Sequence, residues 1–102
     1  MIIDKSHEQY EEMQLFYDVM EIGLAVMGPA ANTTFFRFID KALDTFNIVE
    51  MRLIKDAFAA LHEDQRHALI DGDAESARAV AALKTLQVNC RALARKADIK
   101  IA

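Results

Sequence analysis

Two histidines and a glutamate in the middle of the chain are the residues that come closest to a catalytic pattern. His62 and Glu63 begin a motif like the H-E-x-x-H of zinc metalloproteases, but His67 follows His62 by five residues instead of four. At about 100° per residue, the two imidazoles would point about 140° apart on one helix, so they cannot hold one ion. We interpret both as surface histidines and predict no metal site.

Acidic residues near the N-terminus raise the question of a di-iron site. Such a bundle needs Glu-x-x-His on two helices, and this pair occurs nowhere in the chain. Glu8, Glu11 and Glu12 instead indicate a solvated face at a helix N-terminus, where the helix dipole favours acids. Three glycines are too few for phosphate-binding loops, and Cys90 occupies an apolar position typical of a small core residue. We expect no enzymatic activity and no cofactor.

The composition predicts one all-α domain spanning residues 1–102. Hydrophobic residues make up 53% of the chain and charged residues 27%, which is typical of a globular or helical-bundle protein. Three glycines and one proline leave too few turn residues for many short strands. We predict a bundle of three or four helices.

Export and membrane insertion are not expected. Cys90 is the single cysteine, so it forms no intrachain disulfide, which favours a reducing compartment. Residues 1–5 lack the pattern of a signal peptide. The apolar stretch 15–27 is shorter than the about 20 residues that a membrane span requires. We predict a cytoplasmic protein that does not contact a membrane.

Capping residues predict the limits of the first helix and the start of the second. Ser6 and Gln9 have capping-box spacing, so the first helix should begin near residues 5–7. Gly28-Pro29 should end it, because proline cannot continue the hydrogen-bond ladder. Gly23, inside this helix, indicates close approach of a neighbouring backbone. The run of residues 32–34 (Asn-Thr-Thr) offers the next N-cap.

The stretch 33–70 is either one long helix or two. Asn47, with Glu50 three residues on, marks the best break because it has the pattern of a fresh N-cap. The apolar phase nevertheless continues through Phe46 and Val49, which leaves the single helix open. The polar residues 62–67 form either an exposed helical stretch or a frayed corner.

A tight turn and one more helix complete the chain. Gly72 should end a helix and Asp73 should cap the next. Residues 98–102 are expected to fray. The last helix is predicted to bury one stripe, spaced by three and four residues: Ala79, Leu83, Leu86, Cys90, Leu93 and Ala97.

The first helix is predicted to be the centre of the bundle. Nearly every side of it is apolar from Leu15 onward, and such a helix belongs inside a structure. Its a and d positions form a coiled-coil-like seam, which together with Phe16 gives our predicted interaction surface: Tyr10, Met13, Phe16, Tyr17, Met20, Leu24 and Met27. The three methionines of this seam indicate a flexibly packed core or, alternatively, a groove for varied partners. Because the chain has few other helices to enclose it, we expect a symmetric homodimer to complete the bundle.

Charge is distributed unevenly along the chain. Residues 1–28 hold six acids and one lysine, whereas residues 73–102 hold six bases and three acids. The two ends should attract one another, within one chain or between chains. The last helix carries a basic stripe: Arg78, Lys84, Arg91, Arg95 and Lys96. Nucleic-acid binding is nevertheless the less favoured interpretation, because the net charge is −4 and Asp73 and Glu75 at the start of this helix repel phosphate.

These observations predict a small non-enzymatic regulatory or adaptor protein. It would act through helix-mediated binding to itself and to another protein. Two alternatives stay open: a nucleic-acid-binding transcriptional regulator that uses the basic last helix, and a secretion or assembly chaperone that holds an amphipathic segment.

Overall fold

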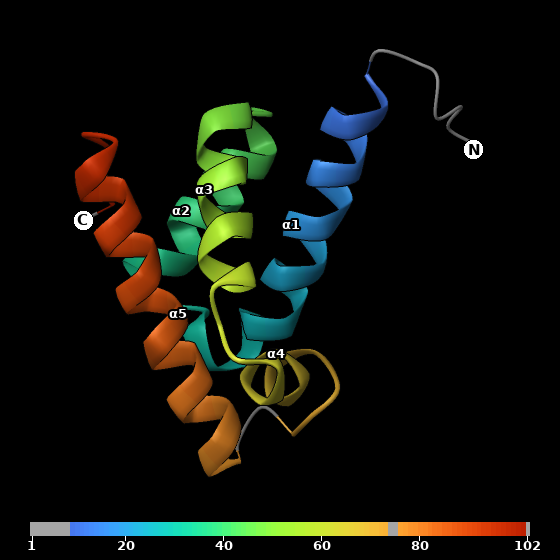
Figure 1. Ribbon diagram of the computed structural model, residues 1–102, viewed down its shortest axis with the longest axis vertical. Coiled ribbons are helices and arrows are strands. Elements are labelled where there is room, and N and C mark those ends of the chain that lie inside the picture. The colour runs from blue at the N-terminus through green and yellow to red at the C-terminus, as the bar shows by residue number, and fades with distance from the viewer. Residues whose placement is uncertain (1–8, 74–75, 102) are drawn as a thin grey trace.

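The computed structural model describes residues 9–73 and 76–101, and all regular secondary structure in these ranges is α-helical. The elements are α1 (Tyr10–Ala30), α2 (Thr34–Asp44), α3 (Ile48–Ala59), α4 (Glu63–Ile70) and α5 (Ala77–Lys96) (Figure 1). The predicted all-α class is confirmed. The predicted number of helices is too low, because residues 33–70 form three helices instead of one or two. Among the described helices, none is both long and apolar enough to cross a bilayer.

The first and last helices form opposite edges of the molecule. In Figure 1, α1 lies at the right and α5 at the left, with α2 and α3 between them and α4 below. α3 packs against α1, α2 and α5, and α1 packs against α2, α3 and α4. The prediction that the first helix is central is only partly confirmed, because α1 contacts three helices but lies at one edge in Figure 1 and leaves one face exposed.

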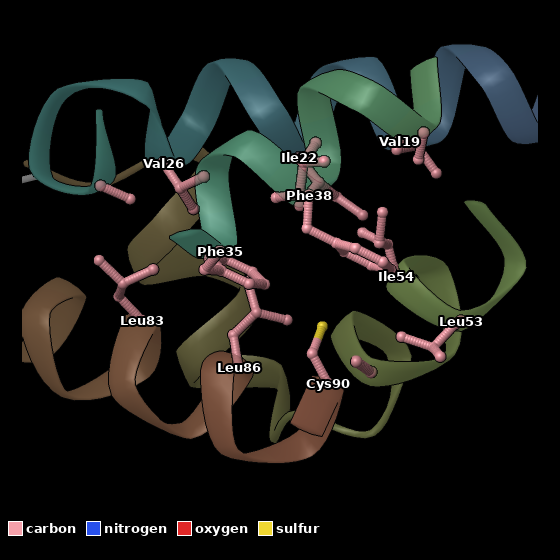
Figure 2. Close-up of a cluster of buried hydrophobic side chains, with 14 of the residues drawn as sticks. Val19, Ile22, Val26, Phe35, Phe38, Leu53, Ile54, Leu83, Leu86 and Cys90 are labelled. Carbon is pink, nitrogen blue, oxygen red and sulfur yellow. The ribbon is translucent and has the colours of Figure 1, made fainter. Parts of the chain in front are cut away.

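The hydrophobic core lies between these two edge helices. Figure 2 shows Ile22 of α1 and Leu86 of α5 directed into one cluster, with Phe35 of α2 between them. The large side chains that are fully buried come from α1, α2, α3 and α5: Val19, Val26, Phe35, Ile39, Met51, Ile54, Leu86 and Cys90. Most of the core stripe predicted for the last helix is confirmed, although Leu93 is only half-buried and Ala97 is exposed.

α1 buries a different face from the one predicted to pack. Its buried apolar positions are spaced by three and four residues: Leu15, Val19, Ile22, Val26 and Ala30. Gly23 is also buried, and a Cβ placed there would lie 3.3 Å from Cγ2 of Ile39. A close approach is therefore present at Gly23, but side chains of α2 make it, and not the neighbouring backbone that was predicted. These aliphatic side chains of α1 enter the core, whereas its methionines and tyrosines are exposed or half-buried.

α1 runs through the Gly28-Pro29 pair and ends at Ala30, so the predicted end of this helix is wrong. A residue before proline normally avoids the helical conformation because its Cβ collides with the proline ring. Gly28 has no Cβ, which removes this obstacle. Ala30 is buried in the core, so one further residue of helix gains apolar contact. The start predicted near residues 5–7 lies outside the described residues.

The N-caps predicted for the second and third helices are confirmed. The side chain of Thr33 accepts a hydrogen bond from the backbone N–H of Phe36 (3.1 Å). The side chain of Asn47 accepts one from the backbone N–H of Glu50 (3.0 Å). The break at Asn47 that the sequence favoured is thus present.

Phe46 closes α2 in an unusual conformation. Its φ of 50° lies in the left-handed region, which a bulky side chain rarely adopts. The N–H of Asn47 donates to the carbonyl of Ala42 (2.9 Å) and the N–H of Phe46 to that of Leu43 (3.2 Å), the hydrogen bonds of a Schellman motif. This turn interrupts the apolar phase, so Phe46 and Val49 are exposed and not part of a buried stripe.

A second break, which the sequence did not predict, separates α3 from α4. His62 is the N-cap of α4: its Nδ1 accepts from the N–H of Asp64, and the Gln65 side chain accepts from the N–H of His62. The polar residues 62–67 are therefore mainly an exposed helix. Gly72 follows the end of α4 as predicted, and a Cβ there would collide with the carbonyl oxygen of Ala68.

The last helix differs from its prediction at both ends. Ser76, and not Asp73, is the N-cap of α5, and its hydroxyl accepts from the N–H of Ala79 (3.1 Å). After the helix, the N–H of Ile99 donates to the carbonyl of Ala94 (2.8 Å). Ile99 and Ile101 pack against the core, so residues 98–101 fold back in place of the expected fraying.

Candidate interaction surfaces

Most of the predicted interaction residues lie on the side of α1 that faces away from the core, while Phe16 at its border packs against the core. Four large apolar side chains are exposed there: Leu24 (62%), Met27 (48%), Tyr17 (42%) and Met20 (37%). Tyr10, Met13 and Phe16 are half-buried beside them. We call these seven residues the α1 outer face. In Figure 1 it belongs to the helix at the right edge, beyond which no other helix lies.

The methionines of α1 do not pack the core. Met20 and Met27 are exposed and Met13 is half-buried, whereas Met51 of α3 is fully buried. Met13, Met20 and Met27 are therefore not part of the core of a single chain. Flexible, polarizable thioethers on a surface can adapt to partners of different shape, which leaves the alternative of a partner groove as a prediction.

Aromatic rings extend the α1 outer face toward α2. Phe46 stacks on Phe16, with ring centroids 5.6 Å apart and an interplanar angle of 28°. Phe16 meets Tyr17 edge to face at 6.0 Å. The left-handed turn at Phe46 thus places an exposed ring beside α1. Sequence reasoning missed Phe46 as a surface residue because its apolar spacing matched a continuous core stripe.

The charges on α1 are all acidic. Glu11, Glu12, Asp18 and Glu21 stand on this helix without a basic residue. Asp18 is engaged by Lys55 of α3, whose Nζ lies 2.6 Å from the carboxylate. Glu21 is exposed and lies three residues before Leu24 and four after Tyr17, so it borders the α1 outer face.

The basic stripe divides into two groups on α5. Lys84, Arg91 and Arg95 share one exposed side because they are spaced by seven and four residues, whereas Arg78 and Lys96 lie farther around the helix. Two exposed valines accompany the first group. We call this set the α5 outer face: Val80, Lys84, Val88, Arg91 and Arg95. Across residues 9–73 and 76–101, its three cations have no ionic partner.

The acidic and basic helices do not pair within one chain. α3 lies between α1 and α5 in Figure 1, and the same two helices lie on opposite sides of the core in Figure 2. Attraction inside the chain, one of the two predicted options, is therefore not realised by the described residues of these helices. Attraction between chains stays a prediction.

His62 and His67 face solvent and contact acids. His67 lies between its helical neighbours, with Nδ1 3.0 Å from Asp71 and Nε2 3.8 Å from Glu63. His62 is an N-cap, so the two imidazoles are not on one helical face. Within the part of the chain that the structure describes, no three His, Cys, Asp or Glu side chains gather as metal ligands.

Cys90 is enclosed by the core. Loss of hydration on burial raises the pKa of its thiol from 9.0 to about 12, against a smaller lowering effect of the Arg91 guanidinium. A nucleophilic cysteine needs an accessible thiolate. The position that the sequence indicated, a small residue inside the core, agrees with this environment.

An open groove of about 450 Å³ lies at the C-terminal end of α5. Its lining combines apolar and basic side chains: Ala94, Ile99, Ile101, Arg91, Arg95 and Lys100. A second groove of about 390 Å³ adjoins it at Ile99 and runs between α3 and α5. Arg91 and Arg95 therefore border both the groove and the α5 outer face.

Comparison with known proteins adds no information on function, so the proposal below depends on the fold and on these surfaces. No protein-family model, no curated protein and no solved structure matches this chain.

Proposed function

We propose that this chain is a small, non-enzymatic regulatory or adaptor protein of the cytoplasm that binds itself and another protein through the α1 outer face. The observation that carries the proposal is the exposure of Tyr17, Met20, Leu24 and Met27 on a helix whose other face is fully built into the core. Contiguous apolar patches on soluble monomers mark interaction sites.

The energetics of burial support this use of α1. Complete burial of a Leu or Met side chain stabilises by about 1.5–3 kcal/mol relative to exposure. Leu24, Met27 and Met20 are still largely exposed in one chain. A partner that covers them would therefore gain a large part of this free energy. Since the backbone of α1 is held by the core, little backbone order has to be acquired on binding.

Leu24 provides the direct test. Leu24→Asp should abolish self-association, because the partner would have to bury an unpaired carboxylate. Folding should persist, since Leu24 is exposed within one chain. Val49→Asp is the matched control: Val49 is 64% exposed on α3, outside the α1 outer face, against 62% for Leu24.

Light scattering after size-exclusion chromatography measures the mass, and circular dichroism checks that each variant is helical. We expect the wild type and Val49→Asp to exceed the single-chain mass of 11.5 kDa, and Leu24→Asp to match it. A wild type that stays at the single-chain mass at 100 μM or so would refute self-association. An unchanged mass for Leu24→Asp would refute the role of this face.

A second candidate function is nucleic-acid binding, which the alignment of Lys84, Arg91 and Arg95 on one exposed side of α5 favours. The net charge of −4 opposes nucleic-acid binding, because a negatively charged protein repels phosphate.

A further inference from the structure

We infer that the α1 outer face docks onto the α5 outer face of a second copy, so that the chains associate head to tail. This inference rests on the proposed function and names the surface that covers α1.

Charge complementarity carries the inference. α1 holds four acids and no base, of which Asp18 is already paired with Lys55. α5 holds five bases and no acid, of which Arg78 and Lys96 lie outside the α5 outer face. Glu21 borders the α1 outer face, while Lys84, Arg91 and Arg95 lie within the α5 outer face. Docking α1 on α5 therefore brings opposite charges together around the contact.

A symmetric dimer, the alternative assembly, would bring like charges together. A two-fold dimer would place α1 against α1 of the second copy, so acids such as Glu21 would meet an equally acidic helix. Like charges set against each other across an interface are unfavourable. The expectation of a symmetric dimer, drawn from the sequence, is thus the less favoured geometry.

The α5 outer face also has apolar groups for α1 to contact. Val88 is 59% exposed and Val80 is exposed on the same side. Lys84 lies between them, and the aliphatic stems of Lys and Arg cover apolar surface while their charges stay hydrated. Arg91 and Arg95 can in addition stack on exposed rings such as Tyr17 and Phe46, since guanidinium groups favour aromatic faces.

The position of the two faces determines the type of assembly. They lie at opposite edges of the molecule (Figure 1), so one chain cannot join its own faces. A contact between unlike faces leaves one α1 face and one α5 face free on each pair. Such contacts either close into a ring or continue as an open chain.

Two single substitutions test the pairing. Leu24→Lys adds a positive charge to the α1 outer face, and Val88→Glu adds a negative charge to the α5 outer face. Both side chains are exposed, so each variant should fold. Each variant alone should lose association by about tenfold or more, as for a central interface residue. Mixing the two should restore it, because the mixture contains intact α1 and α5 faces on different chains.

Native mass spectrometry identifies the mixed species, with Val49→Asp mixed with wild type as the control. A mixed Leu24→Lys and Val88→Glu complex supports head-to-tail docking. If Val88→Glu alone keeps the wild-type mass, head-to-tail docking is refuted, while self-association through α1 stands. If the wild type itself has the single-chain mass, the proposed self-association fails with it.

Salt gives an independent measurement on the unmodified protein. Raising the salt concentration from about 0.05 M to 0.5 M shortens the Debye length and screens charges at the edge of the contact. Head-to-tail association should weaken over this range because it joins opposite charges. Association that strengthens with salt would indicate α1 paired with α1 and would overturn the inference.

Discussion

Cys90 is the residue whose chemistry is most altered by its position. Because burial raises the pKa of its thiol to about 12, the unfolded chain ionises first as the pH rises. The contribution of the neutral, buried thiol to stability is therefore complete below pH 9 and is lost between pH 9 and 12. The free energy of unfolding should fall by up to about 1.4 kcal/mol per pH unit in this window.

The measurement is urea denaturation of wild type and Cys90→Ala at pH values from 8 to 10.5. Every other ionisable group is the same in both proteins, so the difference between their free energies of unfolding isolates the thiol. We expect the stability advantage of the wild type over Cys90→Ala to shrink as the pH passes 9. A difference that is constant over the whole range would mean that Cys90 ionises as easily in the folded protein as in the unfolded one.

Among single residues, Phe46 illustrates a limit of spacing arguments. Its sequence position continues the stripe of Ile39 and Ala42, both of which are buried. The left-handed turn redirects its ring to the surface beside Phe16. Glycine or asparagine usually occupies the left-handed position after a helix, but residue 46 is phenylalanine. The residue type at this position therefore did not predict the turn.

The side chain of Asn47 caps α3 just after the turn that ends α2. Replacing Asn47 with Ala removes the acceptor for the N–H of Glu50, so Asn47→Ala should lower the free energy of unfolding by about 1 kcal/mol. For a domain of this size that corresponds to a fall in melting temperature of about 4–8 °C. Thermal unfolding followed by circular dichroism measures it.

Asn47→Asp is the matched control, because aspartate caps as well as asparagine and its charge suits a helix N-terminus. Its melting temperature should stay within about 2 °C of the wild type. If Asn47→Ala were equally stable, α2 and α3 would be separated by packing of the helices alone, and the cap would be incidental.

At the scale of the whole molecule, charge distinguishes the two candidate functions. The net charge is −4, and the cations that could bind phosphate are confined to α5. We therefore expect no shift of duplex DNA or RNA in a gel at about 0.15 M salt. Replacing Lys84, Arg91 and Arg95 together with Ala should reduce self-association and leave the nucleic-acid assay unchanged.

A specific gel shift that disappears in the triple variant would place nucleic-acid binding first. Its affinity should then fall with salt at a log–log slope near −0.9 per phosphate contacted. Association between protein faces would depend on salt more weakly, because the apolar part of the contact is not screened.

Local features of the sequence were sufficient to predict the helical class, a cap within residues 32–34, Asn47 as the best position for a break, and most of the buried stripe of α5. Caps are hydrogen bonds between residues two or three apart, and α5 has one narrow apolar stripe, so both can be identified without the rest of the fold.

Only the tertiary structure decided which face of α1 is covered and where α1 lies. A helix that is apolar on nearly every side has no face preferred by periodicity, so its orientation is selected by partners: α2 packs closely at Gly23, and Lys55 of α3 engages Asp18. In the folded protein α3 lies between α1 and α5 (Figure 1), and no single segment of the sequence encodes that separation. The sequence by itself determined that α1 is acidic and α5 is basic. The packing of the other helices decided that these two helices lie far apart within one chain.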